Sequence, residues 1–291
     1  MTVTRGIKVT GLLPPIPTPF LDGRIDLESL QRLLDDLGDN VDGILVGGSV
    51  GETASLTVDE RITVIETVAR HLGGNGFLAV SVSDNAVPNS HRLAEVAAEN
   101  GAHVLVVSCP NHYENSPQML TEYFGTLGDF TPVDLCLYDN PIASHTTLGV
   151  QAICDLARAV PTLTHVKVTD TANGKVAMLR EQTDLVLHAG DDAVLWHQMD
   201  CGVEGAMVAM PMIYPQAMRR FWSAFNAGER DTASELYTPM ARFSHLSLGA
   251  PDYPAVIKAV LHSRGVIESA EVRLPLVRLA ARRQAEVIGA I

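Results

Sequence analysis

The sequence has few basic residues and no clustered cysteines. In 291 residues, 21 Lys and Arg stand against 34 Asp and Glu, and the net charge at pH 7 is −13. No basic stripe interrupts this acidic balance, so we expect neither a nucleic acid nor an anionic membrane as a partner. The absence of a Cys-x-x-Cys pair argues against a zinc site or a disulfide framework and indicates a reduced, intracellular protein. The cysteines stand far apart, at Cys109, Cys136, Cys154 and Cys201.

The sequence also lacks a long apolar run. No segment is long enough to span a bilayer, and the N-terminal stretch Met-Thr-Val-Thr-Arg-Gly has no apolar core of the kind found in signal peptides. We therefore expect a cytoplasmic protein with no membrane partner. A dinucleotide-binding glycine motif is missing after the early strands, which disfavours an open, doubly wound sheet.

Apolar, β-branched stretches alternate with stretches of helical period between positions 11 and 209. Hydrophobic residues make up 46% of the chain, enough to bury a large core. Eight strands, each followed by a helical stretch, predict a parallel sheet with right-handed crossovers that closes into a (β/α)₈ TIM barrel. The predicted strands cover 11–17, 41–47, 77–82, 102–108, 134–138, 164–168, 185–189 and 205–209, and the predicted helices cover 27–37, 57–71, 90–100, 117–127, 148–159, 174–181 and 193–201.

No strand pattern remains after about position 215. Four amphipathic stretches, at 218–227, 232–247, 253–263 and 274–288, predict helices. We therefore divide the chain into a catalytic barrel, 1–214, and a C-terminal helical domain, 215–291. The loop 249–254, Gly-Ala-Pro-Asp-Tyr-Pro, interrupts these helices, and we expect that it can reach back toward the mouth of the barrel.

A lysine stands inside the sixth predicted strand. The stretch 163–170 reads Leu-Thr-His-Val-Lys-Val-Thr-Asp, with Lys167 between two valines. Burial disfavours the charged ammonium form, so a lysine in such a strand is a candidate amine nucleophile. The residues by themselves leave a second interpretation open, in which the lysine reaches solvent or pairs with an acid.

The active site of such a barrel lies at the C-terminal ends of the strands. Tyr138 ends the strand before that of Lys167, so the phenol and the amine can meet. An amine that attacks a ketone to form an imine, with a phenol that transfers the protons, is class I aldolase chemistry and needs no metal or organic cofactor. The loop 47–51 offers backbone N–H groups for a substrate carboxylate. The remaining strand ends add Ser49, Val50, His112, Tyr113, Asp191, Asp192 and the segment 209–213 as candidates.

Spaced motifs run along nearly the whole chain. They are Pro-Thr-Pro-Phe at 17–20, Asp-Gly-Ile-Leu-Val-Gly-Gly-Ser-Val-Gly-Glu at 42–52, Tyr-Asp-Asn-Pro at 138–141, Lys167, Gly-Asp-Asp at 190–192 and Gly-Ala at 205–206. Together they resemble the dihydrodipicolinate synthase and N-acetylneuraminate lyase family of pyruvate-binding class I aldolases. The resemblance implies the same barrel with C-terminal helices, commonly assembled as a homotetramer.

The resemblance also implies roles for individual residues. Lys167 would form a Schiff base with pyruvate or a related 2-keto acid, and Tyr138 would relay protons. Ser49 and the amides of Ser49 and Val50 would hold the keto-acid carboxylate, while Glu52 would be structural. Thr169, His112 and Ala209 complete the substrate-binding set that we predict.

Three positions depart from the family pattern. Val50 stands where the family has a second hydroxyl residue, so one hydroxyl is missing from the proton relay. His112, in Pro-Asn-His-Tyr at 110–113, stands where the synthases have the relay tyrosine of the neighbouring subunit. Ala143 replaces an arginine that binds the aldehyde substrate's carboxylate in the synthases, a contact worth about 1.5–3 kcal/mol. His145, close by, replaces that arginine only in part.

Thr169 resembles the lyase branch, in which this residue contacts the sugar-acid chain. We therefore predict a Schiff-base-forming lyase whose partners are a 2-keto acid and an aldehyde, with a 2-keto-3-deoxy sugar acid as the type of substrate. The alternatives are a 4-hydroxy-tetrahydrodipicolinate synthase that joins pyruvate and aspartate semialdehyde, a keto-acid dehydratase and a non-catalytic member that binds a keto acid.

A metal-dependent aldolase or hydrolase on a similar barrel is a competing hypothesis. It would use Asp191, Asp192, His188 and His197 as ligands. Acids in such a position more commonly bind loop amides or helix N-termini. A chelator distinguishes the two mechanisms, because imine chemistry is indifferent to it.

Overall fold

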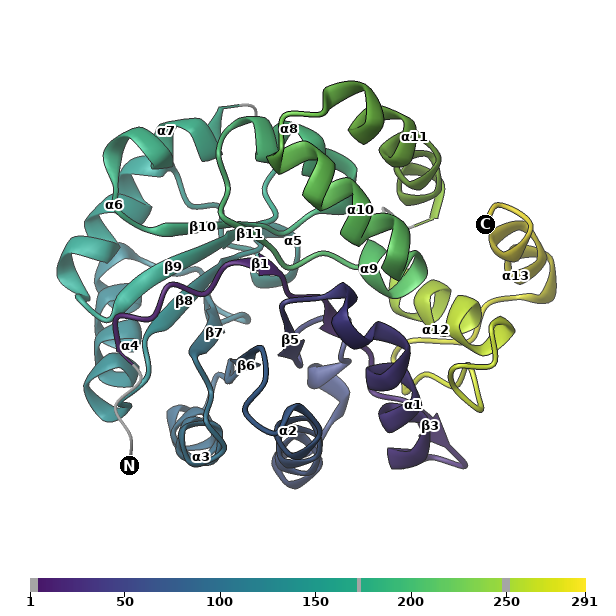
Figure 1. The fold of residues 1–291 in the computed structure, drawn as a ribbon. Helices are drawn as coiled ribbons and strands as arrows, with labels where there is room; N and C mark the ends of the chain where they lie inside the picture. The colour runs from purple at the N-terminus through teal and green to yellow at the C-terminus, as the bar shows by residue number, and fades with distance from the viewer. Residues whose placement is uncertain (1–4, 172–173, 248–251) are drawn as a thin grey trace.

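Parallel strands form a closed barrel at the centre of the molecule (Figure 1). The computed structural model describes residues 5–171, 174–247 and 252–291. In these ranges the strand order is β1-β11-β10-β9-β8-β7-β6-β5-β2, and neighbours pair in parallel. Because β1 and β2 are consecutive parts of the N-terminal segment, the two ends of this order meet and the sheet closes. The predicted (β/α)₈ barrel is confirmed.

Helices follow the strands and surround the barrel (Figure 1). The barrel strands are β1 (Gly11–Leu12), β2 (Pro15–Ile16), β5 (Gly43–Val46), β6 (Phe77–Ser81), β7 (Val104–Ser108), β8 (Leu135–Asp139), β9 (Leu163–Val168), β10 (Val186–Ala189) and β11 (Gly205–Ala206). The helices up to the end of the barrel are α1 (Leu27–Leu37), α2 (Val58–Leu72), α3 (Val87–Glu99), α4 (Pro117–Phe130), α5 (Pro141–Ser144), α6 (Val150–Ala159), α7 (Lys175–Gln182), α8 (Leu195–Asp200) and α9 (Met210–Ile213). A small antiparallel hairpin of β3 (Phe20–Leu21) and β4 (Arg24–Ile25) precedes α1, and short 3₁₀ helices cover Gly38–Asn40, Thr53–Ser55 and Asp192–Val194.

Side-chain caps set the starts of α1 and α2. Asp26 accepts a hydrogen bond from the Ser29 N–H at 3.0 Å, and Thr57 forms a capping box with Glu60. Both caps lie where the sequence predicts them. The cap of α2 ends the loop that leaves β5, so it also fixes one end of a loop at the mouth of the barrel.

The first predicted strand, 11–17, is interrupted and forms β1 and β2. Pro14, Pro15 and Pro17 have no N–H to donate to a neighbouring strand, which breaks the ladder. The Leu13 N–H still donates to the Ala206 carbonyl at 2.8 Å, so the segment keeps its place in the sheet.

The last predicted strand, 205–209, is also too long, because β11 ends at Ala206. The backbone N–H groups of Ala209 and Met210 donate to the carboxylate of Asp192, at 2.9 and 2.7 Å. These amides therefore bond to Asp192 and not to a neighbouring strand. The contact lies at the end of the barrel where the strands have their C-terminal ends.

The C-terminal region is helical, as expected. Its helices are α10 (Pro215–Asn226), α11 (Arg230–Ser247), α12 (Tyr253–Ser263) and α13 (Ala281–Ile288). The predicted helix 274–288 is wrong in its first half, since helix starts only at Ala281. The Leu274 carbonyl accepts a hydrogen bond from Ser55 at 3.0 Å, and Pro275 has no N–H to offer a helix. The chain therefore runs along the barrel here before it turns into α13.

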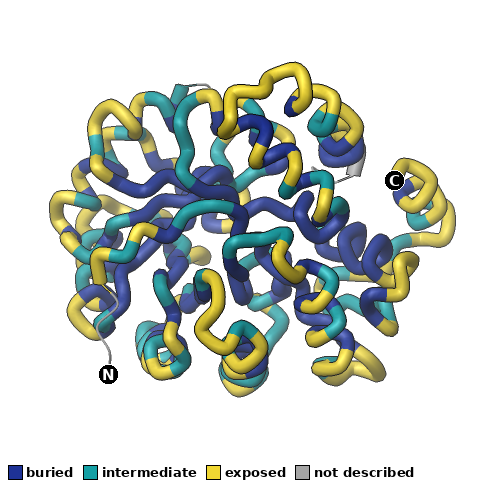
Figure 2. The backbone as a smooth tube through the Cα atoms, viewed as in Figure 1, coloured by how far each residue is buried: buried dark blue, intermediate teal, exposed yellow. Residues whose placement is uncertain are grey.

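The barrel and the C-terminal helices share buried apolar surface (Figure 2). Val256, Ile257 and Val260 of α12 belong to the same cluster as residues of β5 and α1. The division at 214/215 stays a prediction, although the packing joins α12 closely to the barrel. No helix of the described ranges is long and apolar enough to cross a membrane.

A buried ion pair connects α12 with the loop after β5. Lys258 of α12 pairs with Glu52, and both side chains are 0% exposed. Glu52 also accepts a hydrogen bond from the Arg273 N–H at 2.9 Å, and Lys258 donates to the Glu271 carbonyl at 2.8 Å. Burial lowers the pKa of Lys258 to about 8, which leaves the amine protonated at neutral pH. The structural role that the resemblance implies for Glu52 agrees with this pair.

Removal of one partner should destabilise the fold strongly. We expect Lys258→Met to lower the free energy of unfolding by about 3–5 kcal/mol, because Glu52 would remain buried and unpaired. Urea unfolding at pH 7 measures this. The double variant Glu52→Gln/Lys258→Met should lose less, since no buried charge remains. Arg92→Met breaks the exposed pair with Asp59 and should cost less than about 1 kcal/mol. A loss of that size in Lys258→Met would contradict the structural role of the pair.

Candidate active site

Lys167 and Tyr138 lie side by side on neighbouring strands. They are partners in the register of β9 and β8, and both are buried. The Lys167 Nζ lies 4.2 Å from the centroid of the Tyr138 ring. The amine and the phenol are therefore close to each other, as the sequence predicts.

Strand alternation turns Lys167 into the barrel. Val166 and Val168 pack in the cluster that includes the surrounding helices, so the residues between them point to the other face. Gly190 leaves room for the lysine stem, because a Cβ there would lie 3.0 Å from the Lys167 Cγ and 2.7 Å from the Thr169 Cγ2.

Two buried histidines, His165 and His188, neighbour Lys167 in the barrel. His188 pairs with Lys167 in the register of β10 and β9, and the two histidine rings lie 5.7 Å apart. Burial lowers the pKa of His165 to about 4 and that of His188 well below its ordinary value. Both rings are therefore neutral at neutral pH and add no positive charge beside the amine.

The Tyr138 phenol is oriented by Asn140. The Asn140 side-chain oxygen accepts a hydrogen bond from the Ala143 N–H at 3.2 Å, so its NH₂ group faces the phenol and donates to it at 2.9 Å. The Tyr138 oxygen is thus an acceptor in this bond. Its own O–H remains available to donate elsewhere.

Three lysines are buried, and only one lacks a carboxylate partner in the described part of the chain. Lys175 pairs with Asp139 at 2.6 Å and with Asp170 at 2.8 Å, and Lys258 pairs with Glu52. Lys167 is 3% exposed and makes no ion pair within 4.0 Å among the described residues. Asp191 and Asp192 act on Lys167 only from beyond this distance. Without an ion pair, the amine loses less electrostatic stabilisation when it gives up its proton, which favours a nucleophilic role.

The loop after β5 forms a tight turn at the mouth of the barrel. Gly47 and Gly48 have φ of 88° and 74°, and a Cβ on Gly47 would lie 3.0 Å from the Thr53 side chain. Among the described residues, the N–H groups of Ser49 and Val50 donate to no other backbone group. The Val50 side chain is 6% exposed and packs in the apolar cluster. The loop therefore presents backbone amides and the Ser49 hydroxyl at the barrel mouth. The Val50 side chain adds no hydroxyl.

The other predicted binding residues do not form one cluster. The Thr169 hydroxyl is half-buried and donates to the Asp139 carbonyl at 2.6 Å. The Ala209 N–H is held by Asp192. His112 is exposed, with a left-handed φ of 88°, and stacks edge to face on Tyr113. Thr169 and Ala209 belong to the strand ends, whereas His112 lies on the surface loop after β7.

Sequence reasoning missed one residue at the site. Tyr253, the first residue of α12, packs against the apolar cluster that includes Val50 of the mouth loop. The one sequence feature that pointed to Tyr253 is the loop 249–254, which we expected to extend toward the barrel mouth. Tyr253 supports that expectation, while residues 249–251 of the loop lie outside the described residues.

Comparisons with known proteins identify the family. The model of the dihydrodipicolinate synthetase family matches residues 8–291. The chain belongs to this family. A 4-hydroxy-tetrahydrodipicolinate synthase of Corynebacterium diphtheriae is 27% identical over 95% of this chain and 92% of its own, and one of Bdellovibrio bacteriovorus is 29% identical over 95% of each. The crystal structure of YagE from Escherichia coli K12, a member of this family in complex with pyruvate, shares the fold with a TM-score of 0.89 at 23% identity, covering 96% of each chain.

The dihydrodipicolinate synthetase family consists of class I aldolase-type lyases, and this chain is such an enzyme. The resemblance inferred from the sequence motifs is confirmed. The identities of 27% and 29% show the family and leave the substrate open.

The ligand set of the metal-dependent hypothesis does not gather in the described ranges. No group of three His, Cys, Asp or Glu side chains there is arranged to hold a metal ion. Asp192 binds two backbone amides, His188 is enclosed in the barrel, and His197 contacts Cys201 on α8 at 3.7 Å. These residues serve separate contacts, so this hypothesis is not supported.

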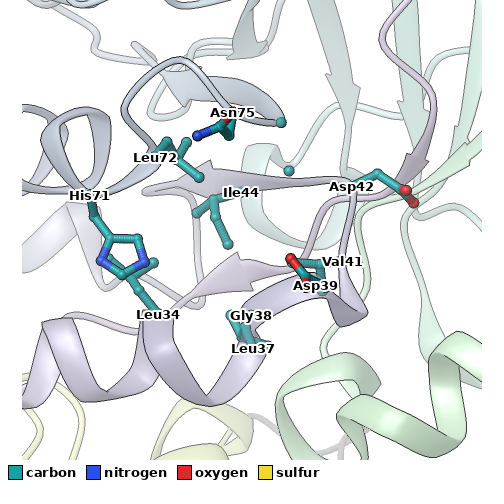
Figure 3. A pocket seen from close by; sticks show the side chains of 12 residues that line it. Leu34, Leu37, Gly38, Asp39, Val41, Asp42, Ile44, His71, Leu72 and Asn75 are labelled. Carbon is teal, nitrogen blue, oxygen red and sulfur yellow. The ribbon is translucent and has the colours of Figure 1, made fainter.

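A cavity of about 220 Å³ lies at the opposite end of β5 from the mouth loop (Figure 3). Its lining includes Asp39, Val41 and Asp42 before β5 and His71 and Asn75 around the end of α2. In barrels of this family the chemistry lies at the C-terminal ends of the strands, and this cavity lies at the N-terminal ends. It is therefore distinct from the Lys167 site.

Titration of Asp192 should be visible in the stability of the protein. Burial raises its pKa to about 6, although the amides of Ala209 and Met210 favour the carboxylate. Between pH 4 and 6 the folded state therefore holds more protons than the unfolded state, so the Asp192 contribution to the free energy of unfolding falls as pH rises. We expect the difference between wild type and Asp192→Asn to fall by about 2–3 kcal/mol over this window. Urea unfolding at pH 4, 5, 6 and 7 measures it.

Asp155→Asn is the contrasting variant. The side chains of Gln151 and then Arg158 lower the pKa of the exposed Asp155, so its contribution should have the opposite sign and rise with pH. Parallel pH profiles for wild type and Asp192→Asn would contradict the burial of a titrating carboxyl at this position.

Proposed function

We propose that Lys167 forms an imine with pyruvate or a related 2-keto acid and that Tyr138 transfers the protons. The observation that carries this is the contrast among the buried lysines, since Lys167 alone lacks a carboxylate partner in the described ranges and lies over the Tyr138 ring. YagE, which has the same fold, was crystallised with pyruvate. The imine nitrogen draws electrons from the neighbouring carbon–carbon bond, so the proposed reaction needs no metal or organic cofactor.

The keto-acid carboxylate is best placed at the loop after β5. The amides of Ser49 and Val50, which have no backbone partner among the described residues, and the Ser49 hydroxyl offer donors there. Thr169 can contribute acceptor lone pairs, because its O–H already serves Asp139. Ala209 can contribute its methyl group or carbonyl, because its N–H serves Asp192. A contact from His112 requires the surface loop after β7 to close over the site.

The aldehyde half of the proposed substrate is a neutral polyol chain, as in a 2-keto-3-deoxy sugar acid. Ala143 is exposed and has no cationic group, so it cannot bind a second carboxylate. The second candidate is 4-hydroxy-tetrahydrodipicolinate synthesis from pyruvate and aspartate semialdehyde, which the names of the curated relatives favour. A homotetramer and a cytoplasmic location stay expectations from the sequence.

Borohydride trapping tests the imine directly. We expect reduction in the presence of pyruvate to leave one pyruvate-sized adduct on Lys167, found by intact mass and peptide mapping. Lys167→Ala should fold and give no adduct. Lys8→Ala is the control, because Lys8 is exposed and its removal leaves no buried charge unpaired, and it should still give the Lys167 adduct. A folded wild-type protein without adduct would contradict the proposal.

A two-substrate assay separates the candidate functions. We expect the protein to release pyruvate from a 2-keto-3-deoxyhexonate at least about tenfold faster than it condenses pyruvate with aspartate semialdehyde, given the missing arginine at position 143. Coupling to lactate dehydrogenase measures pyruvate release, and an end-point assay of quenched samples with the same enzyme measures the pyruvate that remains after condensation. In Ala143→Arg the balance should shift toward the semialdehyde. Faster condensation by the wild type would favour the synthase function instead.

A further inference from the structure

The residues on either side of Lys167 form one row across the barrel interior. Successive partners in the register of β8, β9, β10 and β11 are Tyr138, Lys167, His188 and Gly205. Residues paired in this way lie about 5 Å apart and point to the same face of the sheet. Lys167 therefore has a phenol on one side, over whose ring its Nζ lies at 4.2 Å, and an imidazole on the other.

The imidazole of His188 has no hydrogen-bond partner at either ring nitrogen within the described ranges. The residue is 0% exposed, so it has no contact with the solvent. A neutral imidazole carries one N–H and one lone pair, and leaving both unpaired in the interior costs free energy. Folded proteins keep few such groups, and each one calls for an explanation, of which a catalytic role is one.

His165, in the same interior, shows the contrast. The Val9 N–H donates to its Nε2 at 3.2 Å, which leaves the proton of the neutral ring on Nδ1, and this nitrogen contacts the Thr164 hydroxyl at 2.7 Å. The ring is stacked on that of His188, with 5.7 Å between the centroids. His165 thus has no lone pair left to offer to Lys167, whereas His188 has one.

Gly205 gives the His188 ring its room. A Cβ on Gly205 would lie 2.5 Å from the His188 Nδ1 and 2.8 Å from its Cε1, so the ring covers this glycine. Gly11, the partner of Gly205 in the register of β1 and β11, also lacks a side chain. Because no hydrogen bond from a described residue holds either nitrogen, the ring can turn a lone pair toward Lys167 without breaking one.

We propose that His188 accepts a hydrogen bond from the N–H of the iminium that Lys167 forms with a 2-keto acid. This inference rests on the imine function proposed above. In that reaction the neutral amine bonds to the carbon of the protonated carbonyl group, water leaves with the carbonyl oxygen, and the nitrogen keeps one proton in the iminium cation. His188 thus contacts the reacting nitrogen itself.

A neutral acceptor suits the iminium better than a carboxylate does. The positive charge on the nitrogen draws electrons from the neighbouring carbon–carbon bond, and a carboxylate in contact with it would offset that charge. An imidazole stabilises the N–H and leaves the charge in place. Burial keeps the pKa of His188 well below its ordinary value, so the ring does not take the proton itself.

The first test is the equilibrium between free protein and adduct. The protein is incubated with increasing pyruvate at pH 7 and quenched rapidly with borohydride, and the adduct fraction is read from the intact mass. We expect His188→Leu to raise the half-saturating pyruvate concentration at least about tenfold, because the iminium loses a hydrogen bond to a charged group. His188→Gln keeps an acceptor oxygen and should recover most of this loss. His188→Met takes the place of the leucine variant if that variant does not fold.

His91→Leu is the matched control. His91 lies on α3, outside the barrel, and its Nε2 is also buried without a partner in the described part of the chain. Its ring stacks on Phe130 with 3.9 Å between the centroids. This variant removes an unpaired imidazole nitrogen away from Lys167, so it should keep the wild-type half-saturating concentration.

An infrared measurement separates a hydrogen bond from a structural effect. Pyruvate labelled with carbon-13 at the keto carbon identifies the C=N stretching band of the iminium. The shift of this band on transfer to heavy water grows with the strength of the hydrogen bond at the N–H. We expect a smaller shift in His188→Leu than in the wild type, and the wild-type shift in His91→Leu.

Three outcomes would overturn the inference and leave Lys167 in its role. They are an unchanged half-saturating concentration in His188→Leu, a loss in His188→Gln as large as that in His188→Leu, and a heavy-water shift that is the same in His188→Leu and the wild type. A wild-type protein that forms no adduct would overturn the proposed function as well, which the wild type alone reveals.

Discussion

The buried ion pair between Glu52 and Lys258 holds the site together. Two charges that are fully removed from water separate only at the cost of leaving one of them unpaired in the interior. The pair joins the loop after β5, which carries the amides and the Ser49 hydroxyl at the barrel mouth, to α12. The ion pair thus fixes the position of the mouth loop relative to the C-terminal helices.

Much of the fold can be predicted from the sequence because its signals are local. Alternation of apolar strands with helical stretches, the cap residues Asp26 and Thr57, and the lysine in an otherwise apolar strand each need only a few neighbouring residues. The neighbouring strands of Tyr138 and Lys167 follow from strand order, since consecutive βα units of a barrel lie side by side. The meeting of phenol and amine was therefore predictable.

The missed features depend on contacts between distant parts of the chain. β11 ends early because Asp192 takes the amides of Ala209 and Met210, and neither position shows this in its own sequence. Tyr253 begins a helix that the sequence assigns to a separate domain, and its contact with the cluster that includes Val50 follows from the packing of α12.

The three buried lysines show why burial alone does not select a nucleophile. Lys175 and Lys258 are as buried as Lys167, yet each faces carboxylates that stabilise the ammonium form and hold the nitrogen in a fixed contact. Lys167 lies over the Tyr138 ring and near the neutral histidines, and the carboxyl groups of Asp191 and Asp192 act on it only from beyond ion-pair distance. The amine can therefore exchange its proton for a bond to carbon without losing a charge partner. Among the described residues, the lack of an ion pair distinguishes Lys167 from Lys175 and Lys258, and it suits the nucleophilic role proposed for Lys167.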